Sequence, residues 1–193
     1  MPFRAPPASA AWRHRDARAG FEVVFLHTDG DDLRVEGATA AVEDGEAWAV
    51  QYSIALGSGW TTRSARVVSR SAGGARELRI EGDGAGRWRI DGEPVPELDG
   101  CLDVDLEASA FTNALPVHRL GLEIGRAADA PAVYVRAPGL HVERLEQRYV
   151  RLDDAEHGQR YGYAAPRFRF ECELSYDAHG LVLEYPGIAV RAA

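Results

Sequence analysis

Apolar and polar residues alternate with a period of two along much of this chain. Ala47–Leu56 places a large apolar side chain at every second position, and Phe168–Tyr176 repeats the pattern. This alternation is typical of a β-strand with one buried face. Turn residues such as Asp91-Gly92 interrupt the alternation roughly every eight to twelve residues, as in sandwiches, rolls and barrels. We therefore predict an all-β fold, in which an antiparallel sheet of many short strands curls into a barrel-like roll or half-barrel with few or no helices.

Other segments give a weaker pattern. Trp60–Arg70 has no strongly apolar face, which suits a wet barrel wall or a sheet edge. Val142–Leu152 is assigned to a strand, although its pattern also fits a short helix, and Leu120–Gly125 is assigned to a short strand. Phe111–Pro116 is expected to be a compact loop, because the residue before a proline is pushed out of helical conformation.

The length of 193 residues fits one domain. We expect residues 1–10 to be a flexible N-terminus and residues 11–193 to form the all-β domain. The net charge of −8 has the wrong sign for a phosphate-backbone binder, so nucleic acid is not an expected partner. The start of the chain has no apolar core of signal-peptide length and no later run is long enough to span a membrane, so we expect a cytoplasmic protein without integral membrane contact.

Few residues suggest a metal, a cofactor or a nucleophile. Cys101 and Cys172 lack ligand partners at metal spacing, and the six His residues form no ligand set, so neither a metal nor a cofactor is expected. Gly57-Ser58-Gly59 lacks the α/β context of a nucleophile elbow. Gly82–Gly86 lacks the helix and lysine that follow a phosphate-binding loop.

Acidic residues alternate with apolar residues after Cys101. Asp103 and Asp105 fall on one face of the predicted strand, and paired carboxylates can bind a cation or perform acid/base chemistry. Such alternation equally describes the solvated face of an ordinary strand. Both interpretations remain open from the sequence.

The region around these carboxylates resembles the bacterial family described as putative glycolipid-binding, formerly a domain of unknown function. The resemblance rests on Gly86, Trp88, Asp91-Gly92, Pro96, Leu98–Cys101, Asp103–Leu106, Ser109, Phe111–Asn113, Leu115–Val117 and Arg119-Leu120, and it extends to Trp60, Tyr149, Tyr161, Tyr163, Phe168 and Gly180–Gly187. It implies a curled antiparallel sheet similar to the half-barrel of periplasmic lipoprotein carriers, although this chain shows no export signal.

The resemblance implies a protein that holds a glycolipid or another amphipathic small molecule in a cavity of the curled sheet. The candidate ligand-binding residues are Trp60, Asp103, Asp105, Thr112, Asn113, Arg119, Tyr149 and Tyr163. Arg119 can pair either with an anionic headgroup or with one of the two aspartates. Two alternatives remain: a small enzyme that uses Asp103 and Asp105 on a sugar or sugar-phosphate, and a structural or partner-binding domain. The sequence does not specify an oligomeric state.

Overall fold

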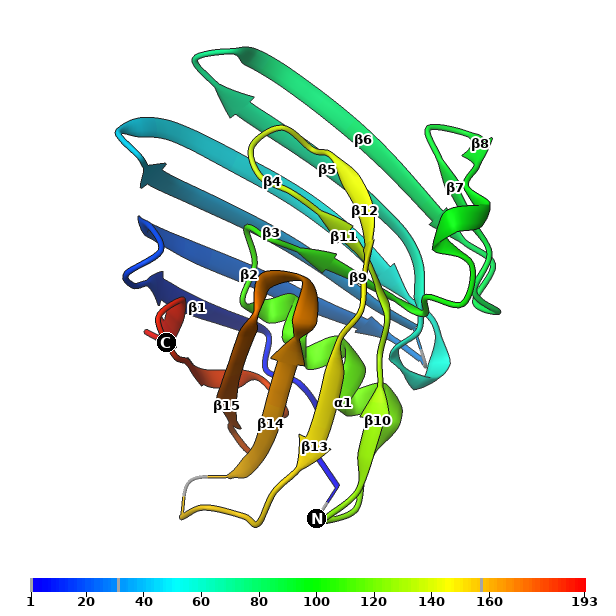
Figure 1. The fold of residues 1–193 in the computed structure, drawn as a ribbon, viewed down its shortest axis with the longest axis vertical. Coiled ribbons are helices and arrows are strands. Elements are labelled where there is room, and N and C mark those ends of the chain that lie inside the picture. Colours follow the sequence, from blue (N-terminus) through cyan, green and yellow to red (C-terminus); the bar gives the residue numbers. More distant parts are fainter. Residues whose placement is uncertain (1, 31, 157) are drawn as a thin grey trace.

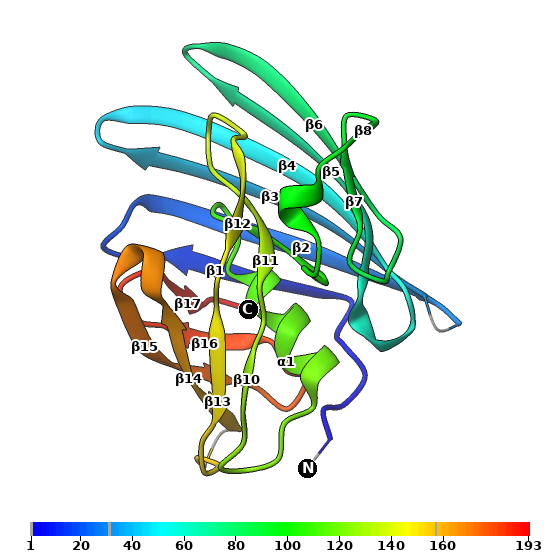
Figure 2. The same cartoon turned by 45° about the vertical axis from the view of Figure 1, so that its right-hand side comes forward.

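The computed structural model describes residues 2–30, 32–156 and 158–193, and most of its elements are β-strands, as predicted. Fourteen strands form one large sheet in which every pairing is antiparallel, and three strands form a smaller second sheet. Within these ranges the one α-helix is α1 (Ala114–Leu120). The large sheet bends round α1 and the small sheet (Figures 1 and 2).

One half of the large sheet consists of consecutive hairpins built mainly from long strands. The predicted strand at Ala47–Leu56 is confirmed, and its large residues from Trp48 to Leu56 are buried. The weakly patterned segment after Trp60 is also a strand, which buries Ala65 and Val67. The strands of this half are β1 (Ser9–His14), β2 (Ala19–Asp29), β3 (Asp32–Glu43), β4 (Glu46–Leu56), β5 (Thr62–Ser71), β6 (Gly74–Gly82), β7 (Trp88–Ile90) and β8 (Glu93–Pro94).

The other half has shorter strands and comes mostly from the end of the chain. Its C-terminal strand pairs with β1, which joins the two halves into one sheet. The strands are β10 (Ala127–Asp129), β13 (Arg148–Arg151), β14 (Gln159–Ala165), β15 (Phe170–Tyr176), β16 (Val182–Tyr185) and β17 (Ala189–Arg191). The sheet does not close, because its edge strands β8 and β10 do not pair with each other. The predicted all-β antiparallel sheet is therefore confirmed, but the barrel is not formed; the helix and the small sheet occupy the space between the halves.

The small sheet contains β9 (Asp103–Leu106), β11 (Ala132–Val135) and β12 (Val142–Leu145). β11 pairs antiparallel with β12 but parallel with β9, with Asp103 opposite Ala132. Parallel strands need a long crossover, and here the crossover contains α1. The parallel pair departs from the wholly antiparallel arrangement expected from the sequence.

Three sequence predictions need local correction. Val142–Leu152 contains two strands in different sheets, β12 and β13, rather than one. Phe111–Pro116 is not a loop, because a 3-10 turn at Phe111–Asn113 leads directly into α1. Leu120–Gly125 is not a strand, because Leu120 ends the helix.

The helix forms despite its proline because Pro116 lies in the first turn, where the missing N–H would have no partner within the helix. Phe111, Leu115 and Val117 are completely buried, so burial of this segment favours the helix over a solvated loop. Gly121 ends α1 in the left-handed conformation at φ 52°, and its N–H donates to the carbonyl of Val117. Further 3-10 turns lie at Ser58–Trp60, Pro96–Leu98 and Pro166–Phe168.

Candidate functional site

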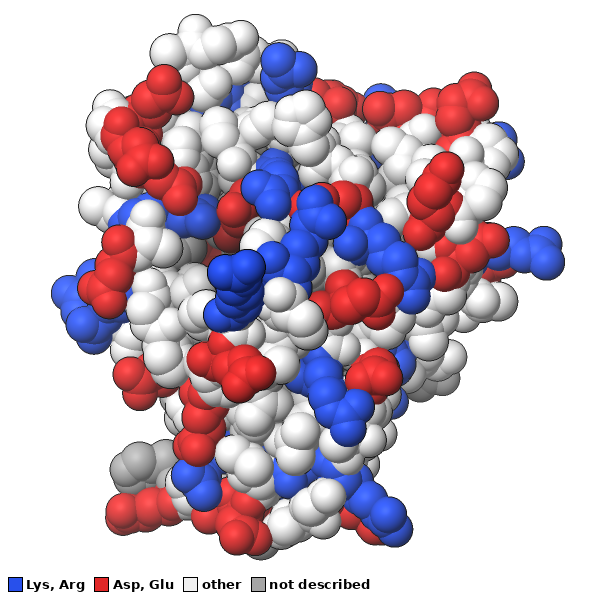
Figure 3. Space-filling view, in the orientation of Figure 1, with Lys and Arg blue, Asp and Glu red and all other residues white. Residues whose placement is uncertain are grey.

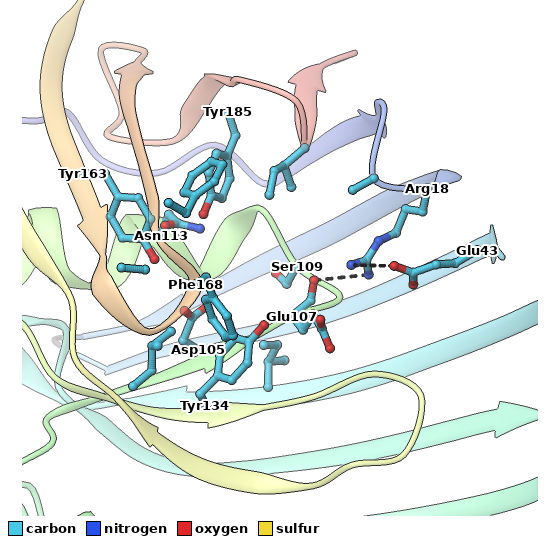
Figure 4. Close-up of a pocket in the computed structure, with 16 residues that line it drawn as sticks. Arg18, Glu43, Asp105, Glu107, Ser109, Asn113, Tyr134, Tyr163, Phe168 and Tyr185 are labelled. Carbon is cyan, nitrogen blue, oxygen red and sulfur yellow. Dashed lines mark hydrogen bonds and ion pairs between the residues drawn. The ribbon is translucent and has the colours of Figure 1, made fainter.

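A cavity of about 280 Å³ lies between the small sheet and the short-stranded half of the large sheet. It has an aromatic wall and a set of polar groups, which Figure 4 shows converging on the same space. The aromatic residues are Tyr134, Tyr163, Phe168, Phe170 and Tyr185; the polar residues are Arg18, Glu43, Asp105, Glu107, Ser109 and Asn113; and the aliphatic residues are Ala17, Leu106, Leu145, Ala165 and Ile188.

The aromatic wall is built by side chains of β11, β14, β15 and β16 and of the 3-10 turn Pro166–Phe168, and these side chains contact one another. Tyr185 meets Tyr163 and Phe170 edge to face, each with ring centroids 5.9 Å apart. Tyr134 of β11 contacts Phe168 in a tilted arrangement, with ring centroids 5.6 Å apart. The edge-to-face pairs of Tyr185 hold the rings in fixed orientations. The wall therefore presents a preformed apolar surface.

Asp105 of β9 is one of the polar groups that line the cavity, and Figure 4 shows it beside the aromatic wall. Its Oδ1 accepts a hydrogen bond from Thr112 Oγ1 at 2.8 Å, and its Oδ2 accepts one from Gln147 Nε2 at 2.6 Å. Burial raises the pKa of Asp105 to about 6, against the opposing effect of these two hydrogen bonds. Gln147 Nε2 also donates to the Tyr163 hydroxyl at 3.0 Å, which ties the carboxylate to the aromatic wall.

Arg18 and Glu43 stand at the opposite end of the cavity from Tyr163 and Asn113 (Figure 4). The Arg18 side chain is 5% exposed, and its Nη2 lies 3.6 Å from Glu43 Oε1. Its Nη1 donates to the carbonyl of Glu107 at 3.3 Å, while its buried Nε has no hydrogen-bond partner among the described residues. Arg18 is therefore a buried cation whose donors are only partly used.

A buried carboxylate supports the cavity from behind. Glu22 Oε1 accepts hydrogen bonds from Tyr52 and from Ser109, which lines the cavity, and its Oε2 accepts one from the N–H of Ala110. Burial raises the pKa of Glu22. These bonds fix the segment between β9 and the helix against β2 and β4, so the position of Ser109 depends on Glu22.

The rim carries a three-residue ion-pair network. Glu143 of β12 pairs with Arg136 at 2.8 Å and with Arg167 at 2.6 Å. Arg136 also lies over the Phe168 ring, 5.5 Å from its centroid. Because Arg167 belongs to the turn after β14, this network connects the small sheet to the large sheet beside the cavity.

The structure brings together three of the predicted ligand-binding residues and places the rest elsewhere. Asp105, Asn113 and Tyr163 line the cavity. Thr112 and Tyr149 lie behind it, where Thr112 holds Asp105 and the Tyr149 hydroxyl donates to Asn113 Oδ1 at 3.1 Å.

Of the other three predicted residues, which lie outside the cavity, two pair with each other and the third stacks on a neighbouring ring. The guanidinium of Arg119 is engaged with the carboxylate of Asp103. Trp60 stacks on His118, with ring centroids 3.5 Å apart and planes 6° apart. These contacts give Asp103, Arg119 and Trp60 structural partners within the chain.

Several cavity residues were not singled out from the sequence. Tyr134, Phe170 and Tyr185 fall at inward positions of strands, where an aromatic residue is usually core, and the alternation alone cannot mark a cavity. Arg18 and Glu43 lie in no recognisable sequence motif. The only feature of the sequence that draws attention to Gln147 is its position two residues before Tyr149. Only the three-dimensional arrangement shows that these residues meet.

Outside the cavity, acidic and basic side chains are mixed over the face shown in Figure 3. Many of the surface arginines are paired, including those in Arg66–Glu77, Arg144–Glu146, Arg148–Asp129 and Arg160–Glu173. The described residues contain no group of three or more His, Cys, Asp or Glu positioned to hold a metal ion. No helix in the same residues is both long enough and apolar enough to cross a membrane.

Comparisons with known proteins agree with this architecture. A model of the family described as "Putative glycolipid-binding" matches residues 9–191. The chain is also similar to the crystal structure of a DUF1089 family protein from Pseudomonas aeruginosa, with 32% sequence identity and a TM-score of 0.76 over 98% of this chain and 95% of that chain. No curated protein matches the chain.

Proposed function

Because the chain belongs to the family described as putative glycolipid-binding, we propose that it binds an amphipathic ligand such as a glycolipid by taking the headgroup into the cavity between its two sheets. The observation that carries this proposal is the arrangement of Asp105, Asn113 and Glu107 beside a wall of aromatic rings. Carboxylates accept hydrogen bonds from hydroxyl groups, and aromatic rings cover the apolar faces of a bound molecule.

The size of the cavity sets which part of the ligand enters. Its volume of about 280 Å³ lies at the lower limit of pockets that enclose a drug-sized molecule. The cavity therefore suits a headgroup, with the lipid chains left outside. Phe168 is exposed and Phe170 is partly buried, so these two rings of the cavity wall can also contact the lipid chains.

The first experiment is mass spectrometry of an organic extract of the purified protein, compared with the Ala17→Trp and Ala72→Trp variants. Ala17 is exposed and lines the cavity, so we expect an indole there to obstruct the cavity without disturbing the core. Ala72 lies on the exposed turn between β5 and β6, outside the cavity, and serves as the control. A stoichiometric lipid in the wild type and in Ala72→Trp, but absent from Ala17→Trp, supports the proposal. The same lipid content in all three proteins contradicts it.

A second candidate is a small enzyme that acts on a sugar, favoured by the pKa of about 6 of the carboxyl group of Asp105 inside a cavity. In this candidate we take Glu107 as the second carboxyl group, because it lines the same cavity as Asp105, whereas Asp103 is engaged with Arg119. Turnover of a glycoside or sugar phosphate that disappears in Asp105→Asn would establish this activity. Equal turnover in the variant would exclude Asp105 as a catalytic group.

A further inference from the structure

We propose that the cavity selects an uncharged, hydroxyl-bearing headgroup and rejects headgroups that carry a sulfate or phosphate. This inference rests on the proposed function and specifies the class of ligand that the cavity accepts. It follows from the charges that face the cavity and from the hydrogen-bonding capacity left open there.

Acidic groups outnumber basic groups in the cavity. Glu43, Asp105 and Glu107 line it together with one cation, Arg18. Glu43 lies 3.6 Å from Arg18 and offsets its charge, so Asp105 and Glu107 remain uncompensated within the cavity. A like charge brought into a partly dehydrated site is repelled more strongly than at an exposed surface.

The groups behind and beside the cavity do not reverse this balance. Asp103, two residues before Asp105 on β9, is paired with Arg119, and Glu22 adds a further buried carboxyl group. At the rim, Glu143 stands between Arg136 and Arg167, which leaves one excess positive charge. Both of these arginines are about half exposed, so solvent and salt screen that charge.

The hydrogen-bonding groups match a polyol. A carboxylate oxygen can accept more than one hydrogen bond, so Asp105 and Glu107 can accept from hydroxyl groups in addition to the bonds they receive from Thr112, Gln147 and the N–H of Ala137, while Arg18 Nε is a donor left unused by the described residues. A sugar hydroxyl both donates and accepts hydrogen bonds. The hydroxyl groups of one sugar ring can therefore donate to Asp105 and Glu107 and accept from Arg18, which face the same cavity (Figure 4). A sulfate only accepts, and it would leave the two carboxylates facing another anion.

The test uses a lipid with a single galactose headgroup and its sulfate ester, each in phosphatidylcholine vesicles at neutral pH. Binding of the full-length chain is measured by vesicle flotation. We expect binding to the neutral lipid to be stronger by about tenfold or more, because like-charge contacts suppress the wrong partner. The double variant Asp105→Asn/Glu107→Gln should reduce that preference to about twofold, since two like charges are removed.

The matched control is Glu171→Gln/Glu184→Gln, which removes the same net charge. Glu171 and Glu184 are exposed, on β15 and β16 respectively, and they do not line the cavity. Retention of the preference in this control assigns it to the cavity rather than to the overall charge of the protein.

Two results would overturn the inference. Equal binding of the two lipids, or stronger binding of the sulfate ester by the wild type, refutes the selection while leaving the proposed function in place. Absence of binding to both lipids, by the wild type and the cavity variant alike, refutes the proposed function and the selection together. Since Asn and Gln can disturb the hydrogen bonds of Asp105, high salt provides a second measurement on the unmodified protein. Salt screens buried charges much less than exposed charges, so a preference set by the cavity should persist at high salt, whereas a preference caused by the net surface charge should be lost.

Discussion

The guanidinium of Arg119 and the carboxylate of Asp103 form a two-point ion pair that is largely withdrawn from solvent. Arg119 Nε lies 3.0 Å from Asp103 Oδ1, and Nη2 lies 2.5 Å from Oδ2. The Asp103 side chain is 2% exposed and that of Arg119 is 14% exposed. Burial raises the pKa of Asp103 although Arg119 opposes the shift. The pair anchors α1 to β9, so it belongs to the scaffold of the cavity.

Breaking this pair should destabilise the fold. Arg119→Met leaves the Asp103 carboxylate buried without its partner, and we expect the free energy of unfolding to fall by about 3–5 kcal/mol. The apolar double variant Asp103→Leu/Arg119→Met should recover much of that loss, because it removes both charges. Urea unfolding measures both effects. Arg148→Met, which breaks an exposed pair with Asp129, is the control and should cost less than about 1 kcal/mol.

The raised pKa of Asp105 predicts a pH-dependent stability. Between about pH 4 and pH 6 the folded protein retains the proton on Asp105 whereas the unfolded chain has lost it, so stability falls as pH rises through this window. The Asp105→Asn variant has no carboxyl group at this position, so its stability lacks this dependence on pH. The stability of the variant relative to the wild type should therefore increase from pH 4 to pH 6, and remain level above pH 7. Chemical denaturation across this range measures the difference, and a constant difference would contradict the prediction.

The aromatic wall predicts which rings contribute to binding. Tyr163→Leu removes a ring that lines the cavity, and we expect glycolipid affinity to fall by about tenfold, the equivalent of 1.4 kcal/mol. Tyr163→Phe keeps the ring and should retain most of the affinity. Trp60→Leu changes a residue that stacks on His118 outside the cavity and should leave affinity within about twofold. Vesicle flotation with folded variants checks all three, and a larger loss in Trp60→Leu would move the site away from the cavity.

The buried Glu22 network predicts a local effect on the segment that carries Ser109. Tyr52→Phe removes the hydroxyl group that donates a hydrogen bond to Glu22. We expect the free energy of unfolding to fall by about 1–3 kcal/mol. Amide hydrogen exchange should also become faster at Ala110, whose N–H donates to the same carboxylate. Unchanged exchange at Ala110 alongside lower global stability would show that the network does not fix this segment.

The sequence was sufficient to predict the strands that bury one face against the core. Ala47–Leu56 and most of Phe168–Tyr176 follow directly from alternation, since burial of one face requires it. The helix after Phe111 was missed because Pro116 signals a break unless its position in the first turn is known. The change of sheet between β12 and β13 was missed because alternation does not report which strand pairs with which.

The candidate site was predicted only in part, for a similar reason. Asp103 and Asp105 alternate with apolar residues in a way that also describes a solvated face. Their actual environments depend on Arg119, Thr112 and Gln147, which approach from other elements of the fold. Tertiary hydrogen bonds of this kind have no periodic signal in the sequence.

Gln147 lies where the chain leaves the small sheet and enters the large one. Its two amide protons are directed to Asp105 in one sheet and to Tyr163 in the other. The two sheets are therefore joined covalently and by hydrogen bonds at the same residue. Neither can separate from the other without breaking these buried hydrogen bonds, so β9, β11 and β14 should open as a single cooperative unit. A ligand that occupies the cavity would then protect from exchange amides that it never touches.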